Sequence, residues 1–109
     1  MIKKKKVEKE VWIDVKGYEG HYKVSSLGRI KSIKRGQDRI LVPIKGSTKS
    51  KGSKIKLYKD GIGRNMNVCT IVSNNFLNRQ PDQMTRHFNG DINDNRVDNL
   101  YLITIGEEF

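Results

Sequence analysis

Short apolar segments alternate with glycine-containing turns through the first third of the chain. The segments are Val11–Val15, Tyr22–Val24 and Arg29–Ile33, separated by turns through Gly17 and Gly20 and through Ser25–Gly28. Successive residues of a strand point to opposite faces of a sheet, so one face can be buried while the other stays polar. The pattern predicts a small antiparallel sheet whose exposed face carries Arg29, Lys31 and Lys34.

Two more strand-forming regions follow. The segment Arg39–Ile44 contains Pro43, which has no N–H to donate, so we expect it at the edge of the sheet. The segments Ile55–Tyr58 and Asn65–Val68 flank the dipeptide Asp60-Gly61, which is favoured in tight hairpin turns. This arrangement predicts a β-hairpin.

The periodicity of apolar residues changes after this hairpin. Val68, Ile71, Val72 and Phe76 are spaced at i, i+3, i+4 and i+8. That spacing places all four on one face of a short helix of about three turns. The predicted fold class is therefore α+β, with a small antiparallel sheet module followed by a short helix.

Chain size limits the possible architecture. With 109 residues and 12.6 kDa, the chain can form one compact domain or two very small modules that share a core. Hydrophobic residues make up 35% of the sequence, so we expect a thin core. The expected organisation is a disordered basic arm over residues 1–9, a basic β-sheet module over residues 10–64 and a second unit over residues 65–109.

Charge is distributed unevenly along the sequence. The formal net charge is +10, and it divides into +13 for residues 1–64 and −3 for residues 65–109. A strongly basic region suits a polyanion, DNA in the first place and RNA as an alternative. The residues predicted to bind nucleic acid are Arg29, Lys31, Lys34, Arg35, Arg39, Lys45, Lys49, Lys51 and Lys54. The last four belong to a Gly/Ser/Lys-rich stretch that is expected to follow phosphates as a flexible arm.

Cysteine content and hydropathy indicate the cellular setting. Cys69 is the single cysteine, which excludes an internal disulfide and favours a reducing compartment. No segment approaches 18 consecutive apolar residues, so no membrane partner is expected. The expected location is the cytoplasm.

Residues 11–33 carry the first resemblance to a known family. Their sequence, VWIDVKGYEGHYKVSSLGRIKSI, resembles the small modular DNA-binding domain, the fourth class of nuclease-associated modules, that precedes the catalytic part of many phage and intron HNH endonucleases. The matching positions are Trp12, Gly17, Tyr18, Gly20, Tyr22, Val24, Gly28 and Arg29. We expect Trp12 and Tyr22 to supply most of the core area of this module, because aromatic side chains bury the largest surfaces.

The second resemblance lies in the block from Thr85 to Leu100, which contains the run Thr-Arg-His-Phe-Asn-Gly-Asp. This block is similar to the HNH homing endonucleases, in which a histidine at the end of a strand accepts a proton from water. The resemblance assigns that role to His87 and implies that residues 65–109 form a truncated ββα-metal hairpin, an HNH-like remnant. Asparagines such as Asn95 and Asn99 are expected to hold the loop between the two strands through side-chain hydrogen bonds.

In the HNH family an Asp or Asn beside the histidine and an Asn on a later helix hold a divalent metal. Here Arg86 occupies the first of these positions, and a guanidinium has no lone pair to donate and repels a dication. The second position falls at Glu108, close to Phe109, where the helix of the family should begin. The remaining candidate metal ligand is Asn89. We therefore expect no cofactor, with Mg²⁺ as the cofactor if the protein is active.

Cys69 stands where the family helix usually has its first histidine, and we expect it to be a small packed hydrophobe.

The phage setting that these resemblances imply makes the expected location the cytoplasm of a phage-infected bacterium. Three functional hypotheses follow. The first is a nucleic-acid-binding protein derived from a phage HNH homing endonuclease and catalytically impaired. The second is a small Mg²⁺-dependent nicking enzyme that uses His87 as its base and Glu108 or Asn89 as a metal ligand. The third is a phage-encoded inhibitor that binds a host defence nuclease, with the acidic second half as the docking surface.

Overall fold

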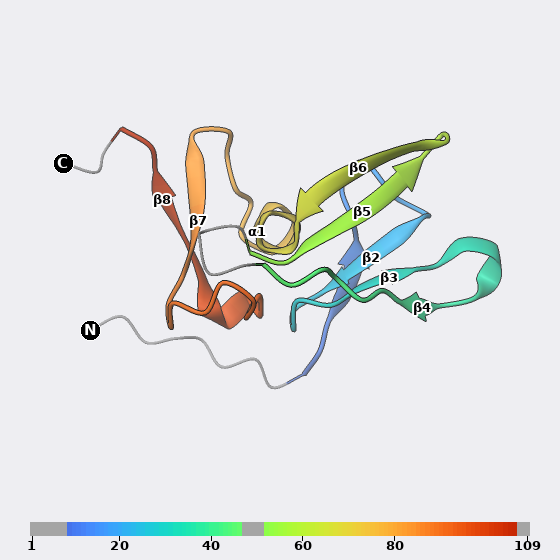
Figure 1. Cartoon of the computed structure of the whole chain (residues 1–109), viewed down its shortest axis with the longest axis horizontal. Helices are drawn as coiled ribbons and strands as arrows, with labels where there is room; N and C mark the ends of the chain where they lie inside the picture. The colour runs from blue at the N-terminus through green and yellow to red at the C-terminus, as the bar shows by residue number, and fades with distance from the viewer. Residues whose placement is uncertain (1–8, 47–51, 107–109) are drawn as a thin grey trace.

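The computed structural model describes residues 9–46 and 52–106, and of Arg35 it describes the backbone alone. These residues form an α+β structure of antiparallel sheets and one α-helix, which confirms the predicted fold class (Figure 1). No helix in these two ranges is both long and apolar enough to cross a membrane.

The first sheet contains four strands in the order β1-β2-β3-β4. They span Trp12–Asp14, Tyr22–Ser25, Ile30–Ser32 and Arg39–Ile40, and a 3₁₀ turn over Lys34–Gly36 connects the last two. All neighbouring strands are antiparallel. The segment containing Pro43 begins at the sheet edge, in agreement with its inability to donate a backbone hydrogen bond.

The hairpin and the helix form as their sequence patterns predict. Strands β5 (Lys54–Lys59) and β6 (Ile62–Asn67) pair through a turn in which Asp60 and Gly61 both have positive φ. Helix α1 (Val68–Phe76) follows β6 directly. Its residues Val68, Ile71 and Val72 are buried, because the helical period places them on one face.

A second hairpin follows the helix. It consists of β7 (Gln83–His87) and β8 (Leu100–Thr104), with a 3₁₀ turn over Val97–Asn99 before β8. Helix α1 lies between this hairpin and the β5–β6 hairpin (Figure 1). The loop from Phe88 to Arg96, between the two strands, returns towards the first sheet.

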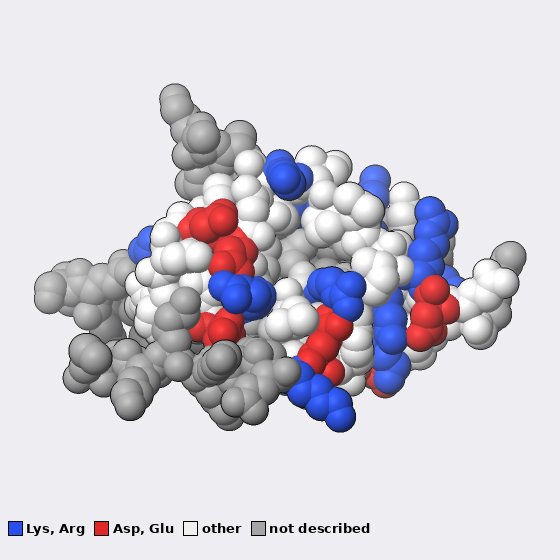
Figure 2. Space-filling view, turned by 90° about the horizontal axis from the view of Figure 1, so that it is seen from below, with Lys and Arg blue, Asp and Glu red and all other residues white. Residues whose placement is uncertain are grey.

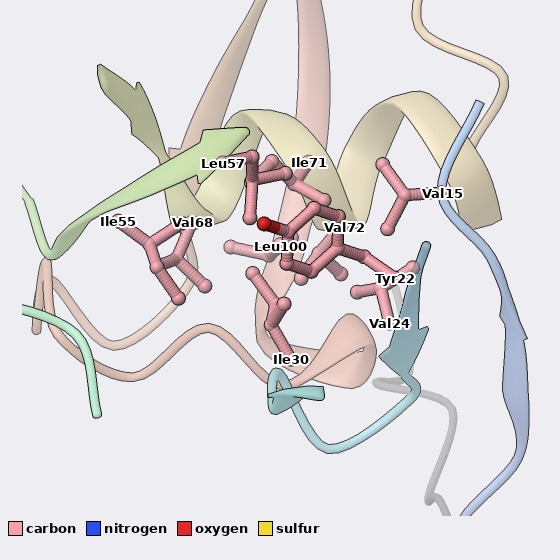
Figure 3. Close-up of a cluster of buried hydrophobic side chains, with 10 residues drawn as sticks. All are labelled: Val15, Tyr22, Val24, Ile30, Ile55, Leu57, Val68, Ile71, Val72 and Leu100. Carbon is pink, nitrogen blue, oxygen red and sulfur yellow. The ribbon is translucent and has the colours of Figure 1, made fainter. Parts of the chain in front are cut away.

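One hydrophobic core is shared by both halves of the chain (Figure 3). Its buried members come from the first sheet, both hairpins and the helix, namely Val15, Tyr22, Val24, Ile30, Ile55, Leu57, Val68, Ile71, Val72 and Leu100. The Tyr22 hydroxyl accepts hydrogen bonds from the Tyr58 backbone N–H at 3.0 Å and from Lys34 Nζ at 3.2 Å. The proposed boundary between residues 64 and 65 therefore does not divide the core, and the two units stabilise one another.

The prediction for Trp12 was wrong. This residue is only half-buried and belongs neither to the core nor to the side chains that pack against it. Adjacent residues of a strand point to opposite faces, and Ile13 occupies the core face of β1. Trp12 consequently lies on the outer face, where Lys31 Nζ is 4.4 Å and Arg29 Cζ 5.5 Å from its ring. The Trp12 ring thus forms cation–π contacts with both of these side chains.

Candidate functional site

His87 is the last residue of β7 and is half-buried. Its Nε2 lies 2.9 Å from Oδ1 of Asn95, whose side chain is buried in the following loop. An amide oxygen accepts hydrogen bonds, so this contact stabilises the tautomer with the proton on Nε2 and the lone pair on Nδ1. Asn95 therefore holds the imidazole in one orientation.

A network of asparagines holds the loop after His87 in place, as predicted. The fully buried Asn99 donates from Nδ2 to Asn89 Oδ1 at 3.0 Å and to the Asp94 backbone oxygen at 2.8 Å. Its Oδ1 accepts from the Asn89 N–H at 3.2 Å, and the Phe88 N–H donates to the Asn99 backbone oxygen at 2.8 Å. Buried amides that satisfy several backbone groups fix a loop geometry that has few apolar contacts.

An ion pair strengthens the same loop. Arg96 Nε and Nη2 donate to the two carboxylate oxygens of Asp94 at 2.8 and 2.9 Å. These hydrogen bonds, together with one from Asn89 Nδ2, lower the pKa of Asp94 to about 2, while the Arg96 pKa is raised. Asp91 Oδ1 also accepts from the Asn93 N–H at 2.9 Å. Asp91 and Asp94 therefore have structural roles in the loop.

The N-terminal module contacts this loop directly. The Val97 N–H donates to the Ser26 backbone oxygen at 2.8 Å, which joins the turn at Ser25–Gly28 to the loop. A Cβ on Gly28 would lie 2.6 Å from the Asn95 backbone oxygen, and φ of Gly28 is +81°. Only glycine fits this contact, because it combines a left-handed conformation with a very close backbone approach. The residue that orients His87 is thus positioned by both halves of the chain.

His87 opens onto a groove of about 910 Å³ between β7 and the start of α1. Other residues lining it are Asn67, Cys69, Thr70, Thr85, Arg86 and Tyr101. A 2.7 Å hydrogen bond between Thr85 Oγ1 and Ser73 Oγ connects β7 to helix α1.

Burial raises the pKa of the Cys69 thiol, so this residue is a packed side chain rather than a reactive thiolate.

Of the two predicted metal ligands, Asn89 is engaged in the loop and Glu108 lies outside the described residues. No three or more His, Cys, Asp or Glu side chains within residues 9–46 and 52–106 come together as a metal site. Asn89, a predicted ligand, already uses Oδ1 to accept from the Asp91 N–H and from Asn99 Nδ2. Arg86 lines the His87 groove as a cation. The other predicted ligand, Glu108, lies outside the described residues.

The basic residues predicted to bind nucleic acid differ in their surroundings. Arg29 is exposed but forms an ion pair with Glu10, and Lys31 is largely covered by Trp12 and lies 3.1 Å from Asp38. The prediction that the sheet leaves Lys31 exposed was therefore wrong, because a neighbouring aromatic ring and an acid cover it. Lys34 donates to Tyr22.

The exposed Arg39 and Lys45 and the half-buried Lys54 form no ion pair with the described acids, and the same holds for Lys56, which sequence reasoning did not select. The side chain of Arg35, and Lys49 and Lys51, lie outside the described residues. Figure 2 shows basic side chains over the sheet end of the molecule with acids among them, while acidic side chains gather towards the opposite end.

Glu10 is the partner of a predicted binding residue, and the sequence pattern did not indicate this pairing. It hydrogen-bonds both Nε and Nη2 of Arg29, which lowers the Glu10 pKa, and no local pattern connects positions 19 residues apart. Pairing of β1 with β2 brings the two together.

Comparison with known proteins identifies the family. The model of the NUMOD4 motif matches residues 10–62. DNA endonuclease I-HmuI of Bacillus phage SP01 is 34% identical over 95 residues, and the match covers 85% of this chain and 52% of that protein. The solved structure titled "DNA binding and cleavage by the HNH homing endonuclease I-HmuI" has a TM-score of 0.70 at 33% identity and covers 86% of this chain and 52% of that one.

A further relative is the uncharacterized HNH endonuclease L247 of Acanthamoeba polyphaga mimivirus, 32% identical over 106 residues, or 90% of this chain and 25% of that protein. The chain belongs to the phage HNH homing endonuclease family with an N-terminal NUMOD4 module, as the sequence resemblances predicted. It spans about half of the length of I-HmuI and a quarter of the mimivirus protein.

The contact at Gly28 can be tested by adding one methyl group. We expect Gly28→Ala to lose about 1–3 kcal/mol of unfolding free energy more than Gly17→Ala, because only the former pushes against a backbone. Gly17 is the matched control, since its φ is +84° but no atom lies within 4 Å of an added Cβ. Urea denaturation gives the stabilities, and NMR of the His87 ring should report a displaced imidazole in Gly28→Ala alone. Equal losses with unchanged His87 resonances would contradict this coupling.

The Asp94–Arg96 ion pair predicts that the folded state loses stability at low pH. The folded-state pKa of Asp94, about 2, lies below its ordinary value of 3.8, so its stabilising contribution is present above about pH 4 and disappears as the pH falls towards 2. In Asp94→Asn, the loss of stability over this range should be smaller than in the wild type. Denaturation at a series of pH values measures it, with Asp82→Asn as an exposed control. A wild-type acid profile in Asp94→Asn would contradict the assignment.

Proposed function

We propose that this chain binds double-stranded DNA through its basic first half. The observation that carries the proposal is a set of cations, Arg39, Lys45, Lys54 and Lys56, that have no acidic partner among the described residues. Such cations can replace the counterions of DNA phosphates without first breaking an ion pair within the described part of the protein. The net charge of +13 over residues 1–64 and the similarity to a DNA endonuclease support the same partner.

We further propose that the chain is catalytically impaired and that His87 serves as a positioning group of the loop. Phosphodiester cleavage by this family's chemistry needs a counter-charge for the leaving oxygen, which a metal supplies. Around His87 the described side chains offer Arg86 and an Asn89 engaged in the loop, and neither suits a dication. Without such a charge, an oriented imidazole accelerates phosphodiester cleavage only slightly.

One observation favours a second candidate function, metal-dependent nicking. Asn95 holds Nε2 of His87, and Nδ1 has no hydrogen-bond partner within the described part of the chain. A base held by one nitrogen with its other nitrogen available towards a groove is a common arrangement for proton transfer. In contrast, a protein partner for the acidic residues gains no support, because Asp91 and Asp94 already accept hydrogen bonds from the loop.

DNA binding by phosphate contacts predicts a strong salt dependence. If six to eight phosphates are contacted, a plot of log K against log salt should have a slope of roughly −5 to −7. Replacing Lys45 and Lys56 together by Ala should make this slope shallower by about two. The change Glu10→Gln should make the slope steeper, since it releases Arg29 from its ion pair and allows it to contact a phosphate. Fluorescence anisotropy with a labelled duplex measures all three proteins, and no binding, or identical slopes, would contradict the proposal.

Catalytic impairment predicts that supercoiled plasmid stays intact with the protein and Mg²⁺ or Mn²⁺. The matched control is His87→Ala, which separates any activity of this site from a contaminating nuclease. Gel electrophoresis should show the same plasmid forms with both proteins. Relaxed plasmid with the wild type but not with His87→Ala would establish the nicking function in place of the impaired one.

A further inference from the structure

Three apolar side chains project from the edge of the first sheet. Ile40, Val42 and Ile44 are 45%, 90% and 78% exposed, although the chain has few hydrophobic residues. They alternate with Leu41, which packs against the core, and with the half-buried Pro43. In an extended segment this alternation places all three exposed residues on one side. We call Ile40, Val42 and Ile44 the apolar ridge.

The ridge is held at both ends by backbone hydrogen bonds. The Leu41 N–H donates to the Ile30 oxygen at 2.9 Å, which attaches the segment to β3. Ile44 and Lys54 exchange two hydrogen bonds of 2.8 Å, which attach it to β5. The exposed side chains therefore stand on an ordered backbone and can present a fixed shape to a partner at little entropic cost.

Basic side chains surround the ridge. A groove of about 590 Å³ beside it is lined by Arg39, Lys54 and Lys56 together with the ridge residues, and its lining contains no Asp or Glu. Lys45 follows Ile44 directly and is exposed. None of these four cations pairs with an acid among the described residues. The partner of this surface should therefore combine negative charge with apolar surface.

Duplex DNA has both properties, because phosphates line its grooves and the apolar faces of its base pairs become accessible where a base step opens. Pro43 lacks an N–H and weakens this edge as a template for the backbone of an added peptide strand, which disfavours a protein partner. Apolar side chains that enter a DNA groove can separate the faces of two neighbouring base pairs and bend the duplex. The flanking cations would then contact phosphates on either side.

Resting on the proposed DNA binding, we propose that Val42 and Ile44 form a wedge that enters the minor groove and partly unstacks one base step. Pyrimidine–purine steps such as TA unstack most easily and should be preferred. The wedge would add bending, and a preference for deformable sites, to the salt-dependent binding supplied by the cations.

The test compares the full chain with the variant Val42→Ser/Ile44→Ser. Ile62→Ser is the matched control, since Ile62 is 60% exposed on the β5–β6 hairpin and lies outside the groove beside the ridge. The probes are end-labelled duplexes of about 20 base pairs, one fully paired and one with a central T·T mismatch, which is already partly unstacked. Anisotropy gives affinity, energy transfer between the ends gives bending, and circular dichroism verifies folding.

We expect the wild type and Ile62→Ser to bend the duplex and to bind the mismatched probe more tightly. The double serine variant should lose the bend and this preference, and its affinity should fall about tenfold or more with an unchanged salt slope, because only apolar contacts are removed. A conservative variant, Val42→Leu/Ile44→Leu, should retain the bend. A double serine variant that binds and bends as the wild type does overturns the wedge while leaving DNA binding intact. Failure of the wild type to bind either duplex overturns the proposed function and the wedge with it.

Discussion

The close approach of Gly28 to the backbone of Asn95 is the contact on which the arrangement of this molecule depends. The turn at Gly28 ends the second strand of the basic sheet, and Asn95 lies in the loop that returns from the second hairpin. With a Cβ position only 2.6 Å from a carbonyl oxygen, the contact accepts no other residue. The Val97 to Ser26 hydrogen bond lies beside it, and the side chain of Asn95 holds the ring of His87. A short turn in the NUMOD4 module thereby positions the central residue of the HNH block.

Electrostatic pairing distinguishes the basic residues beside Trp12 from those near β4 and β5. Arg29 and Lys31 neutralise Glu10 and Asp38 and also pack on Trp12, so they stabilise the outer face of the first sheet. The cations near β4 and β5 have no such partners among the described residues. Surface ion pairs contribute little stability individually, yet they decide which cations remain available for a polyanion. Four of these cations, Arg39, Lys45, Lys54 and Lys56, lie near the edge that carries the apolar ridge.

The HNH block holds an oriented histidine beside a loop that is built on side-chain hydrogen bonds. Asn89, Asn99 and Asp91 form hydrogen bonds to backbone groups of the loop or to one another, which stabilises the loop. This arrangement keeps His87 in a fixed tautomer beside a large groove.

Local rules were sufficient for most elements of the fold. Alternation, glycine turns and the helical spacing of Val68, Ile71 and Val72 predicted the strands, both sides of the first hairpin and the helix, because each depends on residues close in sequence. The family and the loop-holding role of Asn95 and Asn99 could also be inferred from sequence. The outward face of Trp12, the pairing of Arg29 with Glu10 and the cover over Lys31 could not, since they depend on which strands pair and in which register. The sequence by itself determined the elements, the charge and the candidate histidine. Only the tertiary structure decided which cations stay available and how His87 is held, because these properties arise from contacts between residues far apart along the chain.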